Sequence, residues 1–306
     1  MSKDSVSPNS SSPQNEQAQK IIREFILGEL SERLSRFAQM TSPLLIVGEV
    51  GLPLVDIAEF MAQTRICGGK KITAPCGQCS DCVAFLAGQS TRVKKIEPDG
   101  QFIKVEQAKD AIDYLSYKRD RDAVLILHRA DKLNVQAANS LLKTIEEPPE
   151  NCWILLTTPS AKSVLPTIRS RVQVVNVPPL SEAFVQKHLQ TEFQDKGTTW
   201  VQGRLDRLLN QNDFFADLLE MEKWLGQVAR KAQPEPLEWM DSREGFLEGL
   251  EKIRLLLKEK LLSGQFQKPM SWIELSEKVD ELESACLQNV DRKLLMDHLY
   301  MAIEDL

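Results

Sequence analysis

The chain has 306 residues, of which 42% are hydrophobic and 27% are charged, and its formal net charge at pH 7 is −6. This length supports two or three compact domains, and the negative net charge argues against a protein that as a whole binds phosphate backbones. No apolar run approaches the roughly 20 residues that span a bilayer, so we expect a cytoplasmic protein without a membrane partner.

The N-terminal segment differs from the rest of the chain. Residues 1–16 are rich in Ser, Pro and Asn and contain almost no apolar residues. Such a segment cannot bury enough surface to offset its ordering entropy, so we expect a disordered tail. From Gln17 to Met40 the apolar residues recur at helical spacing, which predicts a helix.

Short apolar runs then alternate with helical patterns. The runs are Leu44–Val47, Ala123–Leu127, Cys152–Leu156 and Val172–Val177. Apolar strands without alternation, interleaved with helices, are typical of a parallel sheet covered on both faces. We therefore predict an α/β domain over residues 17–179, which Pro178 and Pro179 terminate.

The turn after the first predicted strand has the position of a phosphate-binding loop but not its residues. The pattern G-x-x-x-x-G-K-[ST] is met only by Gly48, because Pro53, Leu54 and Val55 stand in its last three places. Leu offers no ammonium to phosphates, Val offers no hydroxyl to Mg²⁺, and Pro lacks an N–H. We expect a degenerate loop around Gly48 and Gly51 that is non-functional; an ordinary strand-to-helix turn is the alternative.

Four cysteines lie close together in the next polar segment. Cys67, Cys76, Cys79 and Cys82 form the pattern C-x8-C-x2-C-x2-C. In a cytoplasmic protein a disulfide scaffold is disfavoured, whereas thiolates on short C-x-x-C loops suit tetrahedral zinc. Four cysteine ligands leave no open coordination position, so we predict a structural zinc module over residues 67–82. Free thiols and an iron–sulfur cluster are the alternatives, although the ferredoxin spacing is lacking.

The second long apolar run, Ala123–Leu127, precedes His128 and Arg129. A nucleotide hydrolase would carry acidic residues in these two places, to hold Mg²⁺ and to orient water. The sequence therefore lacks both the phosphate-binding residues of the loop and the acidic pair that nucleotide hydrolysis requires.

Three further runs carry a resemblance to a known family. They are Ala137–Pro149 (AANSLLKTIEEPP), Leu155–Thr158 (LLTT) and Leu165–Arg171 (LPTIRSR), with Ala130–Asn134 upstream. They are very similar to the corresponding segments of the AAA+ subunits of the bacterial DNA polymerase III clamp loader. Because the phosphate loop and the acidic pair are degraded, the chain resembles the delta-prime type of subunit rather than the gamma/tau motor.

The resemblance implies an architecture. We expect an AAA+ P-loop-type parallel sheet domain with a zinc-binding insertion, a small helical lid over residues 180–232, and a C-terminal all-helical collar for oligomerisation over residues 240–306. Residues 233–236 (QPEP) predict a linker, and Gly203–Leu209 loosely resembles the Gly/Arg segment of the lid.

The resemblance also implies partners. These are gamma/tau-type ATPase subunits, a delta-type subunit and, through the complex, the sliding clamp and primer-template DNA. DNA polymerase activity then belongs to the complex, and ATP is contacted only on a neighbouring subunit. Thr157 and Thr158 end a strand where AAA+ proteins place a sensor of the γ-phosphate, and we expect them to be structural remnants.

Arg171 is the principal candidate residue. With Ser170 before it and Val172 in place of Cys, it matches the arginine of the family's Ser-Arg-Cys motif. The resemblance implies an arginine finger that acts in trans, and no catalytic residue in cis. A planar, permanently charged guanidinium suits the charge that develops on a γ-phosphate. The alternatives are a surface arginine that pairs with a carboxylate, and Arg169 as the finger.

Two other functions remain open on the sequence. One is an active gamma/tau-like clamp-loader ATPase, and the other is a zinc-containing nucleic-acid-binding protein. Lys70, Lys71, Arg92, Lys94 and Lys95 form a modest basic cluster, which is more typical of a solvated face than of a DNA groove.

Overall fold

A computed structural model of the chain describes residues 13–69, 75–232, 234, 237–263 and 269–304. The chain divides into two compact units, Met1–Phe184 and Val185–Leu306. Within the described residues, none of the helices combines the length and the apolar character that crossing a membrane requires. Residues 1–12 of the predicted tail lie outside the described residues.

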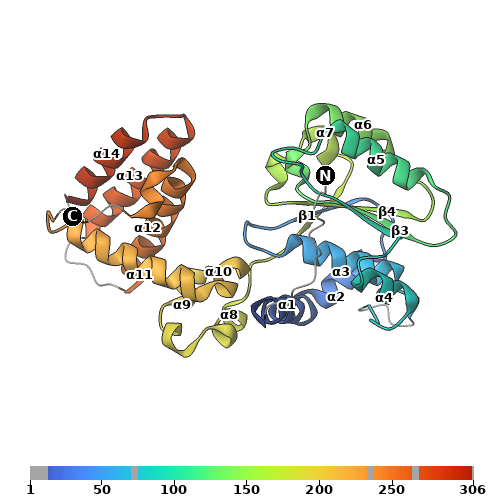
Figure 1. Cartoon of the computed structure of the whole chain (residues 1–306), viewed down its shortest axis with the longest axis horizontal. Coiled ribbons are helices and arrows are strands. Elements are labelled where there is room, and N and C mark those ends of the chain that lie inside the picture. The colour runs from blue at the N-terminus through green and yellow to red at the C-terminus, as the bar shows by residue number, and fades with distance from the viewer. Residues whose placement is uncertain (1–12, 70–74, 233, 235–236, 264–268, 305–306) are drawn as a thin grey trace, which may run out of the picture. The chain divides into compact units, whose positions relative to one another are not determined.

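The first unit is built on a five-stranded parallel sheet (Figure 1). The strands are β1 (Leu44–Val47), β2 (Val93–Ile96), β3 (Ala123–Leu127), β4 (Cys152–Thr158) and β5 (Gln173–Asn176). They lie in the order β2-β3-β4-β1-β5, and every neighbouring pair is parallel. The residues of β3 and β4 are all buried, as expected for a parallel sheet with both faces covered. The predicted fold class, an α/β domain with a parallel sheet, is confirmed.

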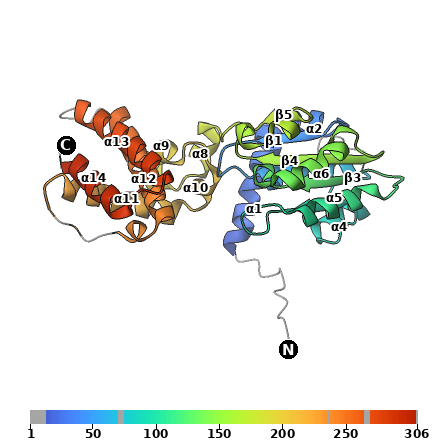
Figure 2. The ribbon, with the colours of Figure 1, turned by 90° about the horizontal axis from the view of Figure 1, so that it is seen from above.

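Helices on the two faces of the sheet supply the core of this unit (Figures 1 and 2). On one face α5 (Val105–Ser116) and α6 (Val135–Glu146) bury small and branched side chains against the strands, such as Ala111 and Leu141 near Leu125. On the other face α3 (Leu54–Ile66) packs against β3 and β4. The remaining helices of this unit are α1 (Pro13–Phe25), α2 (Ser31–Phe37), α4 (Ser80–Leu86) and α7 (Pro166–Arg169).

The helix predicted over 17–40 is divided in the structure. α1 begins at Pro13, so residues 13–16 of the predicted tail are helical, and a π-helical turn at Ile26–Leu30 separates α1 from α2. Ser31 Oγ donates to the Leu27 carbonyl at 2.7 Å within this region. A side-chain hydroxyl bonded to a carbonyl four residues back is a known companion of bent helices.

Strand β2 was not predicted from the sequence. Its residues are Val-Lys-Lys-Ile, so two lysines interrupt the apolar run. β2 is an edge strand, paired only with β3, and its lysines reach counter-ions outside the sheet. Lys94 Nζ lies 2.5 Å from Asp110 Oδ1, and Lys95 Nζ lies 3.1 Å from Glu59 Oε1. Edge strands commonly carry lysines, which discourage pairing with another chain.

The second unit is helical. The boundary between the units falls within α8 (Glu182–His188), and the helices that follow are α9 (Gly197–Val201), α10 (Leu205–Leu209), α11 (Gln211–Val228), α12 (Arg243–Ser263), α13 (Pro269–Leu287) and α14 (Arg292–Glu304). The lid range ends after α11 and the collar range holds α12 to α14; this division stays a prediction. Residues 233, 235 and 236 of the predicted linker lie outside the described residues.

An aromatic cluster forms part of the core of the second unit. Trp224 of α11 meets Trp239 edge-on at 5.9 Å between ring centroids and Tyr300 of α14 at 5.3 Å. Such edge-on pairs stabilise a core beyond their buried area. The indole of Trp239 lies against Gly249 of α12, where a Cβ would come within 2.2 Å of Trp239 Cε3.

We predict that Gly249→Ala destabilises the second unit. The added methyl group would overlap Trp239, and overpacking of this kind costs about 1–3 kcal/mol of unfolding free energy. Gly226→Ala in α11 is the matched control, because an added Cβ there meets nothing within 4 Å and alanine favours a helix by about 0.5–1 kcal/mol. Urea unfolding of both variants is the measurement, and an undiminished stability of Gly249→Ala contradicts this packing.

Candidate functional site

The loop after β1 uses its backbone groups within the chain. Gly48 N–H donates to the Thr158 carbonyl at 3.3 Å, and Gly51 has a positive φ of 90°. Leu52 N–H donates to the Glu49 carbonyl at 3.1 Å, and Leu54 N–H to the Leu52 carbonyl at 2.8 Å. A phosphate-binding loop points such N–H groups at its ligand, whereas these are engaged in the turn itself.

Apolar side chains fill the space beside this loop. A Cβ on Gly48 would come within 2.8 Å of Leu54 Cδ2, 3.1 Å of Leu52 Cδ1 and 3.3 Å of Val177 Cβ. Leu54, in the place of the phosphate-binding lysine, is only 6% exposed. The residue that would contact phosphate is therefore part of the packing at the start of α3.

Polar groups at the carboxyl ends of β3 and β4 bond to one another. His128 Nδ1 lies 2.8 Å from Thr157 Oγ1, and burial lowers the pKa of His128. Arg129, in the left-handed conformation at φ 58°, holds Asp131 with Nε at 3.0 Å and Nη2 at 2.8 Å. Thr158 Oγ1 donates to the same carboxylate at 3.3 Å. Thr157 and Thr158, at the sensor position, thus form hydrogen bonds with neighbouring side chains of the same chain.

The carboxylate in this cluster stays charged. Burial opposes ionisation, but the hydrogen bond and the charge of Arg129 hold the pKa of Asp131 below its usual range. The cluster therefore pairs its one buried anion with a cation from its own loop.

Arg171 lies at the other edge of the sheet. It follows α7 and precedes β5, which is parallel to β1, whereas Gly48 follows β1. The carboxyl ends of parallel strands meet at one edge and the amino ends at the other, so the two sites are separated by about 13 Å of strand. Arg171 cannot act on the loop at Gly48 of its own chain.

A groove of about 490 Å³ surrounds Arg171. Arg171 Nε donates to Glu146 Oε1 at 2.5 Å, so the carboxylate pairing considered in the sequence analysis is present in this structure. Across the groove Arg65 Nε lies 3.1 Å from Asp122 Oδ2. Arg169, the alternative finger, donates from Nη1 to a backbone carbonyl 3.2 Å away.

The four cysteines of the predicted metal site come together. Their sulfur atoms all lie within 4.8 Å of one another, and Cys76 Sγ is 4.0 Å from Cys82 Sγ. Tetrahedral zinc with Zn–S bonds near 2.3 Å requires sulfurs about 3.8 Å apart. Four thiols converging in this way fit a closed metal site. Residues 70–74 of the predicted module, including Lys70 and Lys71, lie outside the described residues.

Backbone N–H groups around the cysteines point at sulfur. Cys76 N–H donates to Cys67 Sγ at 3.3 Å, and Cys82 N–H to Cys79 Sγ at 3.5 Å. The second bond lowers the pKa of the Cys79 thiol to about 6, whereas burial raises the pKa of the Cys82 thiol to about 12. A metal cation would stabilise all four sulfurs as thiolates.

A largely buried ion pair anchors this cysteine module to the sheet domain. Asp81 of α4 lies 2.9 Å from Arg92 Nη1 and 2.6 Å from Arg121 Nη2. Arg92 also donates to the carbonyls of Ile66 at 2.9 Å and Asp122 at 2.8 Å. With Lys94 and Lys95 already paired, the described members of the basic cluster all have counter-ions. Local sequence patterns do not reveal this role of Asp81, because its partners are distant in the chain.

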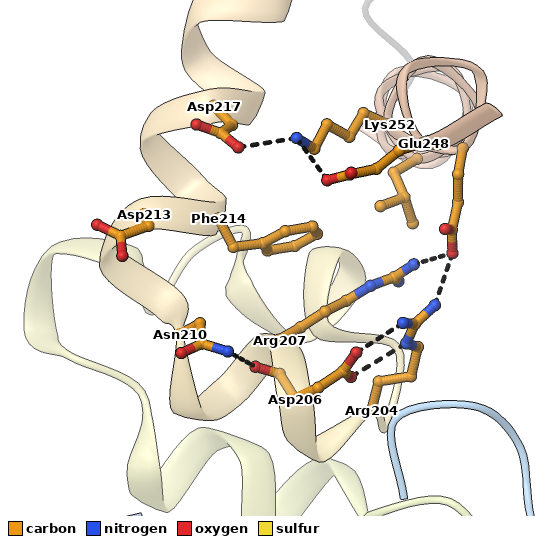
Figure 3. A pocket seen from close by; sticks show the side chains of 11 residues that line it. Arg204, Asp206, Arg207, Asn210, Asp213, Phe214, Asp217, Glu248 and Lys252 are labelled. Carbon is orange, nitrogen blue, oxygen red and sulfur yellow. Dashed lines mark hydrogen bonds and ion pairs between the residues drawn. The ribbon is translucent and has the colours of Figure 1, made fainter. Parts of the chain in front are cut away.

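A cavity of about 440 Å³ lies in the second unit, among α10, α11 and α12 (Figure 3). Arg204 and Arg207 both donate to Glu251 Oε1 of α12, and Arg204 also holds Asp206 at 2.6 Å. Arg207 is only 5% exposed. The arginines of Gly203–Leu209 are therefore directed into an ion-pair cluster within this unit.

Comparison with known proteins identifies the family. Residues 24–181, more than half of the chain, match the family model described as DNA polymerase III, delta subunit. The chain belongs to this family. This agrees with the delta-prime type of subunit that the chain's sequence resembles.

Curated relatives agree with this assignment. The chain is 34% identical over 137 residues to DNA polymerase III subunit delta' of Haemophilus influenzae, covering 44% of this chain and 42% of the relative. It is 31% identical over 146 residues to the Pseudomonas aeruginosa subunit delta', covering 46% and 44%. The tau/gamma subunit of H. influenzae is 31% identical over 147 residues, 47% of this chain and 21% of that one. The chain thus spans less than half the length of the curated relatives it matches.

A solved structure supports the fold over a longer stretch. The gamma subunit-related protein of Thermotoga maritima superposes with a TM-score of 0.53 at 18% identity, covering 90% of this chain and 99% of the other.

We predict that Gly69→Ala weakens metal retention. A Cβ there would lie 3.0 Å from Cys76 Cβ and 3.3 Å from Cys67 Sγ, so the sulfurs must move apart. Disturbing the surroundings of metal ligands lowers affinity by about 10–100-fold. Zinc release to a chromogenic chelator measures this, and Gly28→Ala, which meets nothing within 4 Å, is the control. Equal release by both variants contradicts the close approach of Gly69 to the sulfurs.

Proposed function

We propose that this chain is a delta-prime-like stator subunit of the DNA polymerase III clamp loader. It assembles with the ATPase motor subunits, supplies Arg171 in trans to ATP bound by a neighbour, and helps to load the sliding clamp on primed DNA. The observation that carries the proposal is the position of Arg171, at the sheet edge opposite the loop of Gly48 and Gly51.

The chain's own loop supports a passive role. Leu54 is buried in the place of the phosphate-binding lysine, and the N–H groups of Leu52 and Leu54 are bonded within the turn. At the end of β3, His128 and Arg129 replace the acidic pair and bond to Thr157 and Asp131. Triphosphate hydrolysis needs a magnesium ligand and a group that orients water, and these side chains supply neither. Thr157 and Thr158 are structural remnants in this proposal.

A cation at the opposite edge suits a ring of such subunits. In a ring built by repeating one heterologous contact, each subunit meets its neighbours through two different surfaces. In this proposal those surfaces are the carboxyl edge of one sheet domain and the amino edge of the next. Arg171 and Ser170 then lie toward a neighbour's triphosphate. A guanidinium there stabilises the charge that develops on the γ-phosphate.

The four-cysteine module serves a structural role in this proposal. Cys67, Cys76, Cys79 and Cys82 would hold zinc with no position left open for a substrate. When bound, the ion stabilises four clustered thiolates. The ion pairs of Asp81 connect the module to the sheet domain.

The partners follow from the same proposal. The chain binds gamma/tau-type ATPase subunits and a delta-type subunit, and it meets the sliding clamp and primer-template DNA through the complex, in the cytoplasm. Helices α12 to α14 form the collar through which it assembles. DNA polymerase activity is a property of the holoenzyme.

The isolated chain is predicted to hydrolyse no ATP. The expected result is a turnover indistinguishable from buffer, because the loop after β1 offers no lysine or hydroxyl and no acidic pair directly follows β3. A coupled phosphate-release assay measures it, with a motor subunit as the positive control. Brisk turnover that co-purifies with the chain and survives Arg171→Ala would identify an active gamma/tau-like ATPase instead.

Arg171→Ala is predicted to slow ATP hydrolysis in the assembled loader at the site that receives this residue. The loss there is on the order of 10³-fold, as for other transition-state arginines. Arg171→Lys restores the charge but not the planar fork, so it recovers only part of the rate. Single-turnover hydrolysis in the reconstituted complex is the measurement, with complex formation checked in parallel. A loss on Arg169→Ala in place of Arg171→Ala would move the finger to that residue.

A further inference from the structure

Arg171 is held by its own chain. Nε donates to Glu146 Oε1 at 2.5 Å, and Nη1 donates to the Thr167 carbonyl at 2.8 Å and to Ser170 Oγ at 3.2 Å. Among the residues that the structure describes, Nη2 has no such partner. Two of the three guanidinium nitrogens are therefore engaged within the subunit.

We propose that Glu146 is the counter-ion that retains Arg171 in the unassembled subunit, and that the γ-phosphate of the neighbour's ATP displaces it. The inference rests on the proposed function of Arg171 as a finger in trans. Glu146 then sets how readily the finger is released to ATP, and it takes no part in the chemistry itself.

The pair is placed so that it can open. The side chains of Arg171 and Glu146 are 33% and 46% exposed, and a pair this exposed biases an equilibrium by only about two- to five-fold. A γ-phosphate enclosed between subunits carries more charge and is shielded from water, so its attraction for a guanidinium is stronger. The two anions would also repel each other. Binding of the phosphate therefore favours release of the carboxylate.

The helix ends around the pair favour the resting position. Glu146 is the last residue of α6, where the partial negative charge of the helix C-terminus disfavours a carboxylate. Arg171 offsets this charge, and its Nη1 also satisfies a carbonyl near the end of α7. The arginine is thus drawn to two helix C-termini as long as no stronger anion is present.

Two other arginines, Arg65 of the groove and Arg169 beside it in the chain, bond to other groups and do not compete for Glu146. Arg65 bonds to Asp122 and to the carbonyls of Ala38 and Met40. Arg169 donates to the Ala161 carbonyl. Glu146 and Arg171 therefore form a separate two-residue unit, and a change of Glu146 acts on Arg171 specifically.

The test is steady-state ATP turnover by the reconstituted clamp loader over a range of ATP concentrations. Glu146→Gln keeps the size and a hydrogen-bond acceptor but removes the charge, so the KM for ATP is expected to fall about two- to five-fold with kcat unchanged. Glu147→Gln is the matched control. Glu147 is the next residue in the chain and is also exposed, so this substitution removes the same charge from a neighbouring position. Its KM is expected to equal that of the wild type.

Further variants separate the two levels of the proposal. Unchanged turnover in Arg171→Ala overturns the finger and the counter-ion together. If Arg171→Ala lowers turnover, an unchanged or raised KM in Glu146→Gln overturns the counter-ion alone, as does an equal fall in Glu147→Gln. In an Arg171→Ala background the effect of Glu146→Gln is expected to vanish, because no arginine is left to release. A persistent effect in that background assigns Glu146 a role independent of Arg171 and overturns the inference.

Discussion

The direction of the strands is the constraint on which the rest of the molecule depends. All five strands of the first unit run parallel, so every loop that follows a strand lies at one edge and every loop that precedes a strand lies at the other. The degenerate loop at Gly48 and the His128–Arg129 pair share the first edge, and Arg171 lies at the second. In the proposed function, a chain folded in this way presents a cation to a neighbour's nucleotide, while its own loop after β1 binds none.

At the carboxyl edge of the sheet, the residues that stand in place of nucleotide-binding residues contact one another. An arginine and a histidine stand where a nucleotide hydrolase would carry acidic residues that hold magnesium. A buried polar group without a hydrogen-bond partner lowers the stability of the fold, so both side chains need partners here. Here Arg129 pairs with Asp131, and His128 bonds to Thr157. Leu54 fills space near Gly48 with an apolar side chain. The residues at the positions where an active enzyme would bind its ligand contact one another instead.

In both the cysteine module and the groove around Arg171, an ion pair between distant parts of the chain holds a functional element in place. In the module, close backbone donors and Gly69 bring the sulfurs together. Asp81 ties the helix that carries Cys82, with Cys79 at its N-cap, to Arg92 of the sheet domain. In the groove, Glu146 holds Arg171. The Asp81–Arg92 pair is largely shielded from water, which suits a permanent attachment. The Glu146–Arg171 pair is partly exposed, which suits an ion pair that can open.

By itself the sequence determined what depends on local spacing: the strands β1, β3, β4 and β5 from apolar runs, and the four sulfur donors from short C-x-x-C intervals. Its motif singled out Arg171, whose role as a finger stays a prediction. It did not predict β2, whose two lysines hide an edge strand, because only the neighbouring strand and the counter-ions make that segment extended. Nor did it indicate the partner of Arg171, which lies 25 residues away at the end of another helix. Only the tertiary structure decided which charges meet, because ion pairs are formed by elements that folding brings together, and no local pattern in the chain records them.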